Sequence, residues 1–130
     1  MLSPVRILVG GVLLGVALGS QSADAAMKPT NPTLKATLVD AAKKAQEKAA
    51  TVQVHVGGIK LVDPAKSHEQ PKIGEGHLHY KLDDGPVIAT TTTKLSFHEL
   101  SSGKHNLVVM LAGNDHKPLG PQETLIIEVP

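Results

Sequence analysis

Apolar and polar residues alternate with a period of two over much of the chain after residue 50. The segment 52–62 begins with valines at every second position, and in the segment 76–82 Leu78, Tyr80 and Leu82 share one face. A period of two is typical of a strand that buries one face, because successive side chains point to opposite sides of a sheet. Both segments are therefore predicted to be strands.

Three further segments continue this series of short strands. The stretch 87–97 is rich in Val, Ile and Thr and predicts either one bent strand or two short ones. The runs 105–112 and 123–129 are largely apolar, and Asp83-Asp84-Gly85-Pro86 is a strong turn signal. Short strands at roughly ten-residue spacing, separated by turns, favour an all-β fold, an antiparallel β-sandwich over residues 51–130.

The chain before residue 51 shows a different pattern. Residues 26–33 are polar and contain two prolines, which indicates a linker. From 34 to 50 the chain is rich in Ala and Lys, and its apolar residues lie three or four positions apart. These are Leu34, Leu38, Ala42, Ala45 and Ala49. Such spacing predicts a helix whose apolar face is small, so we expect a linker and a weakly docked helical arm over 26–50.

The first 25 residues have the features of an export signal. Arg6 supplies a positive charge, the 13 residues 7–19 are uncharged and largely apolar, and Ala23-Asp24-Ala25 matches a small-x-small cleavage site. An apolar run of this length is short for a membrane span. We therefore expect a signal peptide over 1–25 and a periplasmic or secreted product without an integral membrane segment. The alternative is an uncleaved N-terminal anchor.

The composition argues against several classes of function. Removing Arg6 and Asp24 with the signal leaves 12 basic and 11 acidic residues, a balance that argues against a nucleic-acid partner. The chain has one Tyr, one Phe and no Trp, so it lacks aromatic platforms on which bases could stack. Because it has no Cys, it also lacks disulfides, the thiolate of a blue-copper centre, an Fe–S cluster and a thiol nucleophile.

Three short motifs carry a resemblance to known domains. They are Gly76-His77-x-His79-Tyr80, Leu100-x-x-Gly103-x-His105, and Asn114-Asp115-His116-x-Pro118-x-Gly120-Pro121. The second motif resembles the penultimate strand of fibronectin-III and bacterial immunoglobulin-like (Ig-like) domains, where a Tyr or His packs at the corner. We expect His105 to take that corner and to hydrogen-bond the turn. The first and third motifs together are similar to a family of small exported bacterial proteins of uncharacterised function. The likeness covers about residues 52–130 and implies an Ig-like sandwich without a known activity.

An Ig-like arrangement brings several histidines to one end of the domain. In that fold the C, F and G strands, here 76–82, 105–112 and 123–129, share one sheet, while B and E belong to the other. The B–C and F–G loops then emerge at the same end. The metal-ligating side chains expected there are His68, Glu75, His77, His79 and His116.

His77 and His79 share one face of their strand, about 6–7 Å apart. Two imidazoles from one strand, with a third from the end of its neighbour, suit copper or zinc. The sequence thus predicts a Cu(II) or Zn(II) site at this end of the sandwich. Outward-facing histidines on an exposed strand that bind no metal are the alternative.

The same face also fits a second function. If Leu107, Val109 and Leu111 face the core, then Val108 and Met110 lie on the outer face with the two histidines. Met110 would add a soft ligand for Cu(I), although packing is the commoner role of a Met. Exposed apolar residues also suit a protein-interaction or structural envelope module that binds no metal and uses the outer C–F–G face.

Catalytic arrangements are not recognisable in the sequence. Ser96, Ser101 and Ser102 have no nucleophile-elbow motif around them, and no Gly-rich phosphate loop precedes a helix. Asp83 and Asp84 are adjacent in a turn, which is better explained by turn chemistry than by paired carboxylates. We therefore expect a protein that is not an enzyme.

Overall fold

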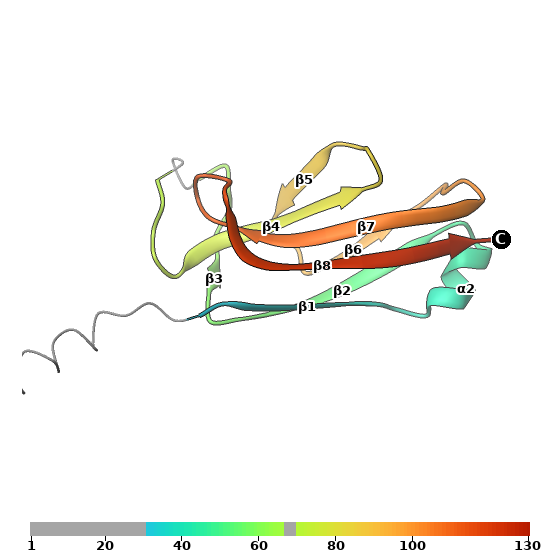
Figure 1. Ribbon diagram of the computed structural model, residues 1–130, viewed down its shortest axis with the longest axis horizontal. Helices are drawn as coiled ribbons and strands as arrows, with labels where there is room; N and C mark the ends of the chain where they lie inside the picture. Colours follow the sequence, from blue (N-terminus) through green and yellow to red (C-terminus); the bar gives the residue numbers. More distant parts are fainter. Residues whose placement is uncertain (1–30, 67–69) are drawn as a thin grey trace, which may run out of the picture.

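The computed structural model describes residues 31–66 and 70–130, which form two β-sheets packed face to face (Figure 1). One sheet has the order β1-β2-β6; the other has the order β3-β4-β7-β8, with β5 beside β4. The elements are β1 (Thr33–Leu38), α2 (Ala41–Gln46), β2 (Ala50–Gly57), β3 (Lys60–Leu61), β4 (Glu75–Leu82), β5 (Val87–Thr90), β6 (Lys94–Phe97), β7 (Gly103–Ala112) and β8 (Pro118–Val129).

The predicted all-β sandwich is confirmed. The expected C, F and G strands are β4, β7 and β8 of one sheet, and the expected B and E strands are β2 and β6 of the other. The predicted signal peptide, 1–25, and His68 lie outside the described residues. Within the described residues no helix is long and apolar enough to cross a membrane.

The core is built from alternate residues of the central strands. Val52 and Val54 of β2 and Tyr80 of β4 are fully buried or nearly so, as are Leu78, Leu107, Val109 and Leu111. The Tyr80 hydroxyl donates a hydrogen bond to the carbonyl oxygen of Thr92 at 2.7 Å, and burial raises the pKa of Tyr80 to about 12. Because these residues face inward, the residues between them on β4 and β7 point to the outer face.

The predicted helix over 34–50 is wrong for its first part. Thr33–Leu38 is the strand β1, which pairs antiparallel with β2 over six residues, and only Ala41–Gln46 is helical. Leu34 and Leu38 fit both a period of two and the helical spacing, and the Ala-rich stripe offers little apolar area to hold a long helix. The sandwich therefore begins at Thr33 rather than at residue 51.

A second difference concerns the chain between β2 and β4. We expected 52–62 to be one extended strand, but the chain leaves the first sheet after Gly57, and Lys60–Leu61 pairs in parallel with β4 in the second sheet. Gly58 makes this crossing at φ 73°, a conformation that favours glycine. For 87–97 the sequence allowed one bent strand or two short ones. The structure has two, because β5 and β6 are short strands in different sheets.

His105 takes the predicted corner position. It is buried at the start of β7, where Nε2 lies 2.8 Å from the carbonyl oxygen of Ser101 and Nδ1 lies 2.6 Å from Oδ2 of Asp83. Both neighbours are acceptors, so the arrangement favours the protonated ring, in which both nitrogens donate. The bond to Ser101 and the bond to Asp83 raise the pKa of His105. The bond between His105 and Asp83 also lowers the pKa of Asp83.

Candidate metal site

The register of β4 and β7 decides which side chains share the outer face with the histidines. His77 pairs with Ala112, His79 with Met110, and Lys81 with Val108. Side chains of directly paired residues in antiparallel strands point to the same side of a sheet. The predicted outer face of His77, His79, Val108 and Met110 is therefore confirmed.

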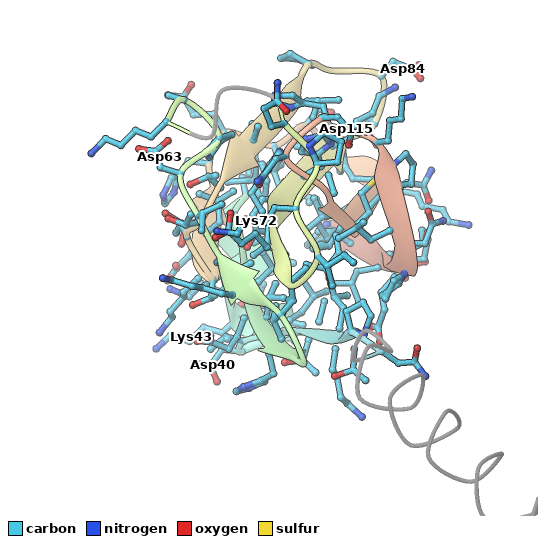
Figure 2. The ribbon with its side chains drawn as sticks, turned by 90° about the vertical axis from the view of Figure 1, so that its left-hand side faces the viewer. Asp40, Lys43, Asp63, Lys72, Asp84 and Asp115 are labelled. Carbon is cyan, nitrogen blue, oxygen red and sulfur yellow. The ribbon has the colours of Figure 1, made fainter. Side chains whose placement is uncertain are left out.

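Three imidazoles meet at the end of this face. His77 Nε2 lies 2.8 Å from His79 Nε2, and His116 Nδ1 lies 3.4 Å from His79 Nε2. The ring of His77 is 4.7 Å from that of His79 and 4.8 Å from that of His116, between centroids. One ligand nitrogen from each ring falls within 4.8 Å of the others. Figure 2 looks onto this end of the molecule, where Asp115 lies in the turn that carries His116.

These distances fit a transition metal. With metal–nitrogen bonds of about 2.0–2.1 Å, two imidazole nitrogens in a tetrahedral site stand about 3.3 Å apart. The separation of His79 and His116, 3.4 Å, is already close to that value. The 2.8 Å separation of His77 and His79 needs to widen by about half an ångström, a movement within reach of small side-chain rotations.

The turn between β7 and β8 positions the third imidazole. The N–H of His116 donates to the carbonyl of Gly113 at 2.8 Å, and the N–H of Gly113 donates to the carbonyl of Lys117 at 2.9 Å. Together these bonds make a tight hairpin turn whose last residue is left-handed, at φ 65° for His116. Glycine usually occupies such a position, because a side chain there costs about 1–2 kcal/mol. An imidazole is thus held at a strained position beside two others.

The histidines favour the neutral state that a metal requires. His77 is fully buried although it points outward, because the other two rings pack against it. Burial, and secondarily the repulsion from protonated His79 and His116, lowers the pKa of His77 to about 4. Burial, followed by His116, also lowers the pKa of His79. At neutral pH these two rings offer lone pairs rather than charges.

Glu75 does not lie in the three-histidine group, although the sequence placed it among the ligands. Its Oε1 accepts a hydrogen bond from Asn114 Nδ2 at 3.2 Å, and Oε2 lies 3.4 Å from the Lys72 ammonium. The bond from Asn114, and then Lys72, lowers the pKa of Glu75. Of the five predicted ligands the structure therefore brings together His77, His79 and His116, and His68 lies outside the described residues.

Asn114 has a structural role that the sequence did not reveal. It is buried, and its Oδ1 has no hydrogen-bond partner among the described residues. The same is true of Nδ1 of His77. When Nε2 of a histidine binds a metal, Nδ1 carries the proton and needs an acceptor. Asn114 itself is held by its bond to Glu75, which lies two residues before His77 in β4.

Replacing His116 with Gly is expected to have opposite effects on the stability of the metal-free protein and on its affinity for metal. Because Gly relieves the left-handed strain, we expect the metal-free protein to gain up to about 1 kcal/mol in free energy of unfolding. Metal affinity should fall at the same time, since one ligand is lost. Lys48→Gly, at another left-handed position (φ 56°), is the matched control and should leave metal binding unchanged. Urea unfolding with a chelator present, alongside a metal titration, measures both. A loss of stability in His116→Gly would contradict the claim that the left-handed conformation of His116 is strained.

Comparison with known proteins does not assign the site. No family model matches the chain, and no curated protein matches it. A similar solved structure is described as the extracellular domain of a one-component system from B. thetaiotaomicron. That similarity has 14% sequence identity and a TM-score of 0.43, and it covers 64% of this chain and 10% of that chain. At this distance it supports no argument about function.

Proposed function

We propose that this protein is an exported, non-enzymatic Ig-like domain that binds a copper or zinc ion through His77, His79 and His116. The observation that carries the proposal is the convergence of three imidazole nitrogens within 4.8 Å from the strand β4 and the turn between β7 and β8. Imidazole is a preferred ligand of both ions, and three protein ligands leave a further position open. Buffering or carrying the ion outside the cytoplasm is the role that fits a small domain without catalytic groups.

Two further observations support the proposal over outward-facing histidines without a ligand. His77 is completely buried, which costs free energy for a ring that has one nitrogen unpaired among the described residues. His116 occupies a left-handed position where Gly would be cheaper. Binding of a shared ion through Nε2 of His77 and the exposed ring of His116 supplies free energy against both costs, while Nδ1 of His77 keeps its proton and stays without a partner among the described residues.

The fluorescence of Tyr80 offers a direct test. Tyr80 follows His79 in β4 and is the single Tyr of a chain without Trp, so it is the dominant fluorophore. We expect Cu(II) to quench this emission with saturation at one ion per chain, and Zn(II) to compete with the quenching. His79→Gln should shift the midpoint to much higher copper concentration. His98→Gln, at an exposed histidine outside the site, is the control. Quenching of His79→Gln with its midpoint at the same copper concentration as in the wild type would contradict the proposal.

A second candidate function is a protein-interaction or structural module without metal. It is favoured by Val87 and Ile126, which are 53% and 43% exposed and lie in register with the outer face of β4 and β7. In that case the double variant His77→Gln, His79→Gln keeps its association, whereas Val87→Lys loses it. Sedimentation of the protein with and without a chelator distinguishes the two functions, since this association needs no ion.

A further inference from the structure

We infer that the ion held by His77, His79 and His116 is Cu(I), and that the thioether of Met110 is its fourth ligand. This inference rests on the proposed metal site and adds the identity of the metal and its oxidation state. It follows from the place of Met110 in the sheet, from the contacts that the nearby carboxylates already make, and from the charge of the ligand set.

Met110 is the direct cross-strand partner of His79 on the outer face. The Cβ atoms of such a pair stand about 4.5–5.5 Å apart, and a Met side chain has three rotatable bonds with which to reach along the face. Met110 is half-buried in the sheet. Ala112, the next residue of β7 on this face, pairs with His77, and its side chain is only a methyl group.

The carboxylates described near the site already bind other groups. Glu75 is bonded by Asn114 and Lys72. Asp115 uses Oδ1 to accept the backbone N–H of Lys117 at 3.1 Å, which holds the turn that carries His116. The chain has no Cys to supply a thiolate. Among the described residues on the outer face, the soft donor in register with the histidines is therefore the sulfur of Met110.

The ligand set is electrically neutral, which favours a monovalent ion. Three imidazoles and a thioether bring no negative charge, and two of the rings are at least partly buried. The desolvation cost of an ion rises with the square of its charge, so Cu(I) is cheaper to hold here than a dication with the same ligands. Thioether sulfur also selects Cu(I), whereas Zn(II) gains little from it.

The test compares Met110→Leu with the wild-type protein for two ions. Leu conserves the volume of Met closely, so the fold should survive, and circular dichroism checks it. Without oxygen, competition with a chromophoric Cu(I) chelator should show an affinity at least about ten-fold weaker in Met110→Leu. Zn(II) affinity should stay within about two-fold of the wild-type value. Val108→Ile, on the same face of β7, is the control and should change neither affinity.

The redox midpoint of bound copper supplies an independent readout. Losing the thioether destabilises Cu(I) relative to Cu(II), so the midpoint potential should fall in Met110→Leu and not in Val108→Ile. The inference is overturned if Met110→Leu binds Cu(I) as tightly as the wild type, or if it weakens Zn(II) equally. Those outcomes leave the three-histidine site standing, provided His77→Gln still abolishes binding. A wild-type protein that binds no copper and no zinc overturns both.

Discussion

Acidification from pH 6.5 to 4 is expected to destabilise the metal-free protein, and replacing His77 with Gln should remove much of that loss. Burial holds the pKa of His77 at about 4 in the folded protein, against about 6.5 in the unfolded chain. Well above pH 6.5 the His77 ring is neutral in both the folded and the unfolded protein, so it does not make the free energy of unfolding depend on pH. Between pH 6.5 and 4 only the unfolded state binds the proton, so the free energy of unfolding falls, by up to about 2–3 kcal/mol.

Urea unfolding at pH 7, 5.5 and 4.5 in the presence of a chelator measures this effect. The difference between wild type and His77→Gln isolates the ring, because groups such as His105 contribute equally to both proteins. His98→Gln should follow the wild-type curve. Parallel loss of stability with falling pH in wild type and His77→Gln would show that His77 becomes protonated without cost in the fold, and that its burial is not tight.

Replacing His105 with Leu is expected to cost about 2–3 kcal/mol at pH 5.5. The substitution removes the donors to Asp83, in the turn after β4, and to the Ser101 carbonyl, in the loop before β7, two hydrogen bonds from a charged ring at the start of β7. The pKa of His105 is raised in the folded state, so its contribution is fully present below about pH 6.5. It is lost as the pH rises through the raised folded value.

The dependence on pH distinguishes this charged corner from simple packing. The stability difference between wild type and His105→Leu, measured by urea unfolding, should shrink between pH 6.5 and 9. Asp83→Asn is the companion variant; it should lower the pKa of His105 and reduce the same difference. A destabilisation of equal size at pH 5.5 and pH 9 would mean that the ring acts by filling space.

The sequence predicted the two-layer fold and the shared face of the histidines because both depend on the period of two. Leu78 and Tyr80 point inward, so His77 and His79 must point outward, and the Ig-like strand order then brings the turn after β7 to the same end. The corner role of His105 was predictable for the same reason, since Leu107 shares its face and the turn Gly precedes it by two residues.

Other features depend on tertiary partners that a single sequence does not reveal. Leu34 and Leu38 satisfy helical and strand periods alike, and pairing with β2 decides between them. Glu123 reinforces that choice, because its carboxylate reaches from β8 to accept the N–H of Ala36 at 3.3 Å. Likewise, the bond between Asn114 and Glu75 joins residues 39 positions apart, so the engagement of Glu75 could not be read from its place beside the histidines.

The measurement that tests the central claim most directly is a calorimetric titration of the untagged protein and of His77→Gln with Cu(II) and Zn(II) at pH 7.4. The three-histidine site requires one ion per wild-type chain with a dissociation constant below about 1 μM, and an affinity reduced about 100-fold or more in His77→Gln. Heat that is weak, without a defined stoichiometry and unchanged in His77→Gln would contradict the metal site and leave the outer sheet face as a surface for protein partners.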